Sequence, residues 1–337
     1  MQEKRMSRFV ALTGLGIGLF MFIACAPQPA NAPAASSAET SANTLTAIKV
    51  PAVVSDTAAS YWVDAPVLTV HTKASSEGQP DGADVNVQAV YDDQAIAMRL
   101  EWADTTKSDL NKAWVWDGSA FSRSPNLGDR MGVLFAMENN AEFAAKGCAA
   151  ACHNSDQDVE KWWMGADSAD LHYDLWQWTA ATTNPVNQAQ DQWLNVLDTP
   201  ADSESATHPD DQTGGGSLSN TNEAKDGPAY VNGADLTSSF IITGQQAPIE
   251  LSQLANGAAI PTSILAPWVG SRGDVTANGV WQDDKWVVVL VRTLDTGHED
   301  DVVFTPPKSY PLGLAIFDHN DLVNHTTAPD VVTLEWK

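Results

Sequence analysis

Short apolar runs separated by turn residues restrict the fold of this 337-residue chain more than any other feature. Residues 94–102 carry a large apolar side chain at every second position, namely Ile96, Met98, Leu100 and Trp102. A period of two is typical of a β-strand that buries one face, so we expect Met98 in the core rather than on an iron ion. The Asp92–Asp93 pair predicts a turn back to residues 85–91, and thus a β-hairpin.

Similar runs recur along the chain. They predict strands within residues 61–70, 129–137, 279–281, 285–292, 310–317 and 331–336. The runs are short, turns rich in Asp, Gly and Pro separate them, and no regular helices alternate with them. The chain is therefore predicted to be mainly β, an antiparallel β-sandwich with irregular loops and a few short helices. We expect the run 129–137 at the centre of a sheet and the last strand to pair with an early one.

Two segments do not follow this pattern. Residues 162–197 concentrate tryptophans with only weak helical spacing, which predicts an irregular flap rather than a sheet strand. Residues 198–235 are polar and contain three consecutive glycines at 214–216. A long polar stretch of this kind indicates a surface insertion. We therefore predict a single folded domain over residues 49–337, with a polar insertion at about 198–235.

The N-terminal segment is typical of an exported protein. An apolar run extends over residues 9–24, and the basic residues Lys4, Arg5 and Arg8 precede it. A short apolar run behind positive charges, ending in small residues, indicates a signal peptide rather than a permanent membrane span. Residues 1–24 are therefore predicted to be a signal peptide of the lipoprotein type.

Residues 22–25, Phe-Ile-Ala-Cys, are similar to the bacterial lipobox, whose cysteine becomes the lipidated first residue of the mature protein. Cys25 is thus predicted to carry lipid, with cleavage near residues 30–32 as the alternative. Residues 25–48 have few large apolar side chains, which predicts a disordered tether. Together these features indicate a periplasmic or outer-face location on a bacterial membrane, with the lipid as the only anchor.

The formal net charge of −25 limits the partners of the chain. Such an acidic protein is not expected to bind nucleic acid or to adhere electrostatically to an anionic membrane. The charge serves solubility, or it steers the protein toward a basic partner such as a redox protein.

The sequence Cys-Ala-Ala-Ala-Cys-His at residues 148–153 is the strongest chemical motif. In c-type haem attachment, two cysteines form thioethers to the porphyrin and the following histidine binds the iron. The usual spacing has two residues between the cysteines, whereas three separate Cys148 from Cys152 here. The alternative is a disulfide between these two cysteines, the only ones that remain if Cys25 is lipidated.

A family resemblance emerges from the order of several motifs. They are the strand Asp-Arg-Met-Gly-Val-Leu-Phe (129–135), the Cys-x3-Cys-His loop, Asp-Leu-Trp-Gln-Trp (174–178) followed by Thr-Asn-Pro (183–185), Trp-x4-Trp-Val-Val-Val-Leu-Val-Arg (281–292) and Leu-Gly-Leu-Ala-Ile-Phe-Asp (312–318). This ordered set resembles the haem-binding domain of the ethylbenzene dehydrogenase-related family. The family includes the haem subunits of molybdoenzymes of the type II dimethyl sulfoxide reductase family, and related c-type cytochromes.

The resemblance implies an immunoglobulin-like or DOMON-like β-sandwich that holds one haem between loops and transfers electrons. The molybdoenzyme subunits bind a non-covalent b-type haem through methionine and lysine. This chain departs from them by carrying attachment cysteines and His153, which predicts one covalent haem c. The family's second ligand comes from the loop before the last strand, where His325 fits best. Other candidates for that position are His319, His172, Met137 and Met164.

Three functions remain open from the sequence. The first is an exported monohaem c-type cytochrome that carries electrons to or from a redox partner, such as another cytochrome or a molybdenum oxidoreductase, and catalyses nothing itself. The second is a haem subunit of a periplasmic molybdenum oxidoreductase complex. The third is a non-redox β-sandwich lipoprotein that binds a ligand, with its two cysteines bridged. No nucleophile elbow, phosphate loop or His-Glu-x-x-His motif indicates catalysis by the chain itself.

Overall fold

A computed structural model describes residues 43–75, 79–153, 163–194, 214–319 and 325–337. The predicted signal peptide, Cys25 and the tether as far as residue 42 lie outside these residues, so their predictions are not tested by the structure. The end of the predicted tether is wrong, because strand β1 (Thr44–Lys49) begins within it. Leu45 and Ala47 of β1 are fully buried, which explains why this segment is ordered.

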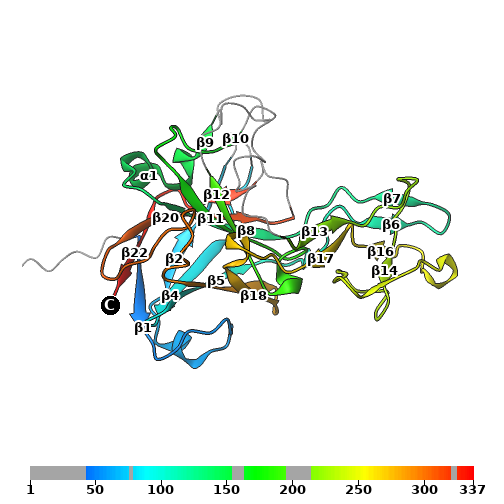
Figure 1. Cartoon of the computed structure of the whole chain (residues 1–337), viewed down its shortest axis with the longest axis horizontal. Coiled ribbons are helices and arrows are strands. Elements are labelled where there is room, and N and C mark those ends of the chain that lie inside the picture. Colours follow the sequence, from blue (N-terminus) through cyan, green and yellow to red (C-terminus); the bar gives the residue numbers. More distant parts are fainter. Residues whose placement is uncertain (1–42, 76–78, 154–162, 195–213, 320–324) are drawn as a thin grey trace, which may run out of the picture. The chain divides into compact units, whose positions relative to one another are not determined.

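One curled sheet forms the main body of the fold (Figure 1). Its strands are, in spatial order, β12 (Gln190–Leu194), β11 (Tyr173–Thr179), β8 (Arg130–Ala136), β20 (Tyr310–Phe317), β22 (Val332–Trp336), β1, β4 (Asp84–Tyr91), β5 (Ala95–Ala103), β19 (Lys285–Thr293) and β18 (Thr276–Trp281). Three short strands join its sides: β2 (Leu68–His71), β3 (Lys73–Ala74) and β21 (Thr326–Thr327). The mainly β fold is as predicted.

The two ends of this sheet approach each other. A bridge joins Gln188, just before β12, to Thr276 at the start of β18. Backbone hydrogen bonds of 3.0 Å from Ala189 N to Val275 O and from Ala277 N to Asn187 O flank it. The sheet therefore folds back on itself and encloses one core, as the two layers of a sandwich do.

Most strand pairs are antiparallel, but the sheet is mixed. β1 pairs in parallel with both β22 and β4, so the predicted antiparallel sandwich also contains one strand in parallel pairing. The pairing of β1 with β22 confirms that the last strand meets an early one. β8 lies between β11 and β20, so its predicted central position is also confirmed.

The predicted β4–β5 hairpin is present, and the predicted strands at 279–281 and 285–292 form a second hairpin, β18–β19. In the β4–β5 turn, Asp92 Oδ1 accepts hydrogen bonds from the backbone N–H groups of Gln94 and Ala95, at 2.7 and 2.8 Å. In the β18–β19 turn, Asp283 and Asp284 both have positive φ, at 54° and 56°. Two consecutive residues with positive φ are typical of the hairpin turn that matches the twist of the strands, and Asp tolerates it better than most residues.

Apolar side chains from both layers fill the core. Met98 is fully buried there, as predicted. Trp178 contacts Trp102 and Trp286 edge to face, with ring centroids 6.2 and 5.0 Å apart. Aromatic pairs of this geometry add stability beyond the area that they bury. Several of the tryptophans that are numerous in the sequence therefore act as core residues.

The prediction of an irregular flap at 162–197 is wrong, because this segment supplies β11 and β12 of the main sheet. β11 is buried on both faces: Trp176 and Trp178 point into the core, while Tyr173 and Leu175 belong to a second apolar cluster outside it. A strand that is buried on both faces shows no alternation of polar and apolar residues, so its period could not be seen in the sequence.

The predicted strand at 61–70 is also corrected. Residues Ser60–Val63 form a 3-10 helix, η1, and the strand there is β2, which begins at Leu68. Trp62 of η1 packs in a small cluster with Val90 and Val289, on the face of the sheet that points away from the core.

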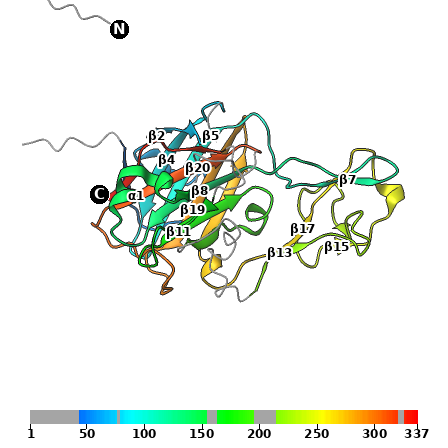
Figure 2. The same cartoon turned by 90° about the horizontal axis from the view of Figure 1, so that it is seen from above.

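The predicted insertion is larger than 198–235. Residues 198–213 lie outside the described part. The segment after them forms short two- and three-stranded sheets together with residues 114–123, which come earlier in the chain (Figure 2). Their strands are β6 (Trp114–Trp116), β7 (Phe121–Arg123), β13 (Gly216–Ser219), β14 (Val231–Asn232), β15 (Gln246–Ala247), β16 (Ala259–Ile260) and β17 (Ser263–Ala266). Trp114, Val231 and Ile260 form the centre of a separate apolar cluster in these sheets.

The short helices are α1 (Ala141–Lys146) and the 3-10 helices η2 (Gly147–Ala150), η4 (Asn184–Val186), η6 (Leu251–Gln253) and η7 (Ser271–Gly273). Within the described residues, no helix has the length and apolar character needed to cross a membrane.

Candidate functional site

A capped helix positions the Cys-x3-Cys-His motif on the sheet. Asn140 caps α1, and its Oδ1 accepts hydrogen bonds of 3.0 Å from the backbone N–H groups of Glu142 and Phe143. The Nδ2 of Asn140 also donates to the hydroxyl of Tyr173 on β11, at 3.1 Å. Gly147 ends the helix with a φ of 57°. The motif is therefore fixed to the sheet at its N-terminal side.

Cys148 lies in η2 and is buried against β20. A Cβ atom added to Gly313 of β20 would lie 2.2 Å from Cys148 Sγ and 2.9 Å from Cys148 N. No side chain other than hydrogen fits at position 313 without displacing the thiol. The Cys148 thiol therefore packs directly against the backbone of Gly313.

Cys152 lies in β9 (Cys152–His153), which pairs with β10 (Trp163–Met164). Cys152 is opposite Met164 and His153 is opposite Trp163. A backbone hydrogen bond of 3.0 Å from Gly165 N to Ala151 O extends this pairing. The motif therefore occupies a short helical turn and a two-residue strand beyond the end of β8.

Apolar side chains surround the Cys148 thiol, while Cys152 is half-buried. The cluster around Cys148 comprises Leu134, Ala136, Phe143, Ala150, Ala151, Ala166, Tyr173, Leu175 and Leu194, with Trp163, Met164 and Leu171 packed against it. Burial raises the pKa of the Cys148 thiol, and the neighbouring Cys152 raises it further. Burial likewise raises the pKa of Cys152. The two thiols are not joined by a disulfide, and both are protonated near neutral pH.

His325 lies beside the end of β20. Its ring stacks on Phe317, with ring centroids 4.8 Å apart and an angle of 24° between the planes. Its Nδ1 lies 3.4 Å from the hydroxyl oxygen of Ser75. The guanidinium carbon of Arg130 lies 4.8 Å from the Phe317 ring centroid. These contacts place His325 on the face of β20 that points away from the core.

The motif and His325 lie on the same face of the sheet, at different positions along β20. Gly313, which contacts Cys148, and Phe317, which stacks on His325, are four positions apart on β20. Alternate residues of a strand share a face, and four positions span about 13 Å. Between them, Ala315 pairs with Gly132 of β8, and both are buried. Only small side chains therefore separate the two groups along these strands.

The alternative ligand candidates have different surroundings. The Nδ1 of His172 lies 2.8 Å from Glu138 Oε1, and its ring stacks on Trp193 with centroids 4.8 Å apart. The Nδ1 of His319 lies 2.7 Å from Asp318 Oδ1. The backbone N–H of Met137 donates to His172 O, at 3.1 Å. Met164, opposite Cys152, is the candidate nearest to the thiols.

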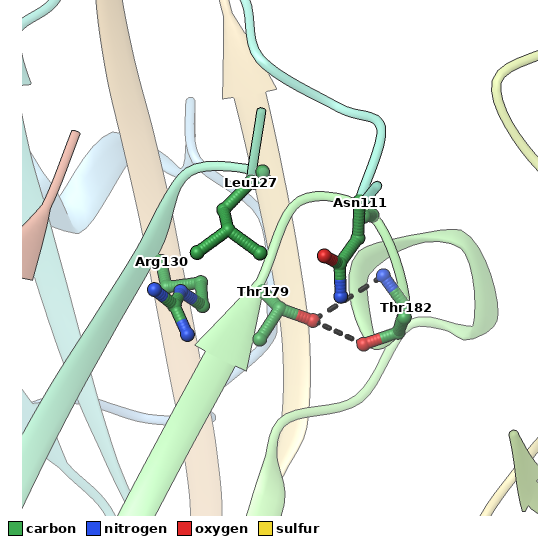
Figure 3. Close-up of a pocket in the computed structure, with 7 residues that line it drawn as sticks. Asn111, Leu127, Arg130, Thr179 and Thr182 are labelled. Atoms are coloured by element: carbon green, nitrogen blue, oxygen red, sulfur yellow. Dashed lines mark hydrogen bonds between the residues drawn. The ribbon is translucent and has the colours of Figure 1, made fainter. Parts of the chain in front are cut away.

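A small cavity lies near the other end of β8 (Figure 3). Its volume is about 30 Å³, and Asn111, Leu127, Arg130, Thr179 and Thr182 line it, together with Gly128 and Ala181. Such a volume has room for one or two water molecules. This cavity is too small for a haem or an organic substrate, so it is not the functional site.

The donor chemistry of the motif fits a covalently held haem. Two unbridged thiols lie on one face of the sheet, and a histidine follows the second directly. The first thiol packs against Gly313. The sequence reading missed Gly313, Asn140 and Tyr173. A glycine inside the apolar run 310–317 is the one signal that pointed there, because such a glycine often marks a close approach of another segment.

Fold and site together define a class: a closed, mainly β protein that carries a thiol–thiol–histidine loop on the outer face of its sheet. The family model of ethylbenzene dehydrogenase matches residues 56–326. The chain therefore belongs to the ethylbenzene dehydrogenase family. This membership suggests a haem-related subunit of a molybdenum oxidoreductase complex.

Solved structures of a family 9 carbohydrate binding module from Caldicellulosiruptor kristjanssonii are similar to this chain. The complex with cellotriose is 7% identical and has a TM-score of 0.34, over 87% of this chain and 93% of that chain. The complex with glucose is 6% identical, also with a TM-score of 0.34, over 87% of this chain and 95% of that chain. Among curated proteins, no sequence matches this chain.

Proposed function

We propose that this protein is an exported c-type cytochrome with one haem, which carries electrons to or from a redox partner. Cys148 and Cys152 would hold the haem covalently, His153 would bind the iron on one side and His325 on the other. The single observation that carries the proposal is that two unbridged thiols, followed by a histidine, lie on the same sheet face as His325.

The chain's own residues have three tasks in this proposal. Cys148 and Cys152 would hold the porphyrin through thioether bonds. Gly313 keeps the first thiol in place, and the apolar cluster around it excludes water. The haem, when bound, supplies an iron that takes up and releases one electron.

The location and partner form part of the same proposal. Lipid on Cys25 would anchor the protein at the periplasmic or outer face of a bacterial membrane, and residues 25–42 would let the folded part reach its partner. The net charge of −25 favours a partner with a basic docking surface. That partner would be another cytochrome or a molybdenum oxidoreductase.

The test is a pyridine haemochrome assay on the full chain, expressed with its signal peptide and a haem-attachment system. We expect haem to stay with the polypeptide after extraction with acidified acetone. A variant with Cys148→Ala and Cys152→Ala should lose all of this haem. Extracted wild-type protein that carries no haem would overturn the proposal. If reduced-minus-oxidised spectra also lacked the α and Soret bands, a non-redox ligand-binding protein would replace it.

Two matched variants decide the second iron ligand. His325→Ala should convert the oxidised iron from low spin to high spin, because one axial ligand is lost. Met164→Ala, at the competing position opposite Cys152, should leave the spin state unchanged. The reverse pattern would assign Met164 in place of His325, with a higher reduction potential.

Family membership favours a second candidate function, a haem subunit of a molybdenum oxidoreductase complex, with catalysis on another chain. Affinity purification from the native membrane distinguishes the two. A molybdenum-containing chain in fixed proportion to this protein would establish the subunit role. Recovery of the protein alone, with its haem, would favour the free carrier.

A further inference from the structure

Three aspartates and one arginine meet inside the core, on the inner face of the strands whose outer face carries the cysteine loop. Arg292 of β19 lies with one terminal nitrogen 2.5 Å from Asp174 Oδ2 and 3.4 Å from Asp191 Oδ2. The same nitrogen lies 3.7 Å from Asp301 Oδ1. The side chains of Asp174, Asp191 and Arg292 have no exposed surface, and that of Asp301 is 3% exposed.

Each carboxylate turns one oxygen toward the arginine and leaves the other without a hydrogen-bond donor. The unpartnered atoms are Asp174 Oδ1, Asp191 Oδ1 and Asp301 Oδ2. A buried polar atom without a partner is destabilising, and more so when it is charged. Three such oxygens in one cluster are therefore stable only if a bound proton, a hydrogen-bond donor or a cation interacts with them.

The charge balance points to the same requirement. With all three carboxylates ionised, the cluster and its one guanidinium would carry a formal charge of −2 in a place without solvent. Arg292 is also oriented by its neighbours, since it donates to the carbonyl of Val302 and lies 4.9 Å from the Trp176 ring centroid. In this position its terminal nitrogen contacts one oxygen of each carboxylate, while the second oxygens and the Nε of Arg292 itself have no hydrogen-bond partner. One divalent cation would neutralise the cluster.

We propose that Asp174, Asp191 and Asp301 bind one Ca²⁺ ion inside the sandwich. One oxygen from each of the three lies within 4.8 Å of the others, so a single cation with Ca–O bonds of about 2.4 Å could reach all three. Because the ligands are carboxylate oxygens only, the site suits a hard cation such as Ca²⁺ rather than Zn²⁺ or Cu²⁺.

A second acidic group shares Asp301 and connects the cluster with the surface. His298 Nδ1 lies 2.7 Å from Asp274 Oδ2 and 4.0 Å from Asp301 Oδ2, and its side chain is 40% exposed. These residues lie on the solvent side of Asp301, where a cation would enter. The calcium site does not depend on the proposed haem, because Asp174 faces the core while its neighbours Tyr173 and Leu175 face the cysteine loop.

Calcium binding to the full chain, purified and treated with a chelator, tests this inference. Isothermal titration with CaCl₂ should show about one site per chain with a dissociation constant of about 10 µM or lower. Saturating Ca²⁺ should raise the midpoint of thermal unfolding by about 5 to 10 °C. Failure of both Ca²⁺ and Mg²⁺ to bind or stabilise a chelated protein that still unfolds cooperatively would overturn the inference.

A charge-neutral variant gives the sharper readout. Asp191→Asn removes one buried carboxylate, so without Ca²⁺ it should unfold at a higher temperature than wild type, and Ca²⁺ should no longer stabilise it. Asp93→Asn, an exposed carboxylate, serves as the matched control and should keep the full calcium effect. Equal stabilisation of Asp191→Asn and wild type by Ca²⁺, or loss of the effect in His298→Ala alone, would place the cation elsewhere and refute the site.

Discussion

Adjacent residues of β11 face two different environments, one on each side of the sheet. On its outer face, Tyr173 and Leu175 help to surround the uncharged Cys148 thiol with apolar side chains. On its inner face, Asp174 joins a buried cluster of charges around Arg292. The outer group keeps the cysteine sulfurs uncharged. The inner group contains three carboxyl groups and only one arginine to compensate their negative charge. Burial favours the uncharged form in both groups, but a thiol is already uncharged near neutral pH, whereas a carboxylate must take up a proton or pair with a cation.

The pKa values express this difference. Burial raises the pKa of both thiols, which favours their uncharged form and thus costs little inside an apolar cluster. Burial and the neighbouring Asp174 raise the pKa of Asp191 well above its ordinary value, and they raise that of Asp301 to about 7. Carboxylates in this position must be protonated or paired with a cation.

The largest expected effect comes from removal of the arginine. Arg292→Met should destabilise the chelator-treated protein by about 3–5 kcal/mol, because three buried carboxylates lose their counter-charge. Chemical denaturation monitored by tryptophan fluorescence measures this change. Lys285→Met is the control, since its ion pair with Glu101 is at the surface and should contribute less than about 1 kcal/mol. An Arg292 variant as stable as the Lys285 variant would mean that the inner charges are not as tightly coupled as their geometry indicates.

The two environments also differ in how far the sequence predicts them. The cysteine motif is visible because its residues are adjacent in the chain, and the strand pattern placed it after the central strand. The inner cluster joins residues from four segments, Asp174, Asp191, Arg292 and Asp301, and nothing local marks any of them as a member. Asp174 and Asp191 moreover lie in the segment that was wrongly predicted as a flap.

The hairpins could be predicted for a similar reason. Their turns and alternating strands are local features, so the β4–β5 and β18–β19 pairs follow from the sequence. The parallel pairing of β1 could not be predicted, since it depends on closing the sheet between the ends of the chain. The packing of Cys148 against Gly313 likewise depends on a contact across the fold.

Asp129 is also a buried carboxylate, but unlike the aspartates of the inner cluster it has hydrogen-bond donors on both oxygens. Asp129 accepts hydrogen bonds from Ser108 N at 2.7 Å, Trp286 Nε1 at 2.9 Å and His319 N at 3.1 Å. Burial nevertheless raises its pKa to about 6. Between about pH 4 and pH 6 the folded protein therefore binds more protons here than the unfolded chain does, so this group lowers stability as pH rises.

Asp129→Asn should remove this contribution. The free energy of unfolding of wild type, relative to the variant, should fall by on the order of 2 kcal/mol as pH rises from about 4 to above 6. Denaturation curves of both proteins at several pH values measure the difference. A difference that stays constant, or grows with pH, would show that the three donors fully compensate for burial and keep the pKa low.

The smallest effect concerns the contact between Cys148 and Gly313. Gly313→Ala should destabilise the fold by about 1–3 kcal/mol, because the new methyl group overlaps the thiol. Gly132→Ala, on the same face of the neighbouring strand, is the matched control, since its nearest contact would be an ordinary 3.4 Å from Leu175. In the Gly313→Ala background, Cys148→Ala should cost less than it does in wild type, because it removes the overlapping sulfur. Additive effects of the two substitutions would mean that the thiol does not rest on Gly313, and the loop would then be free to place Cys148 elsewhere.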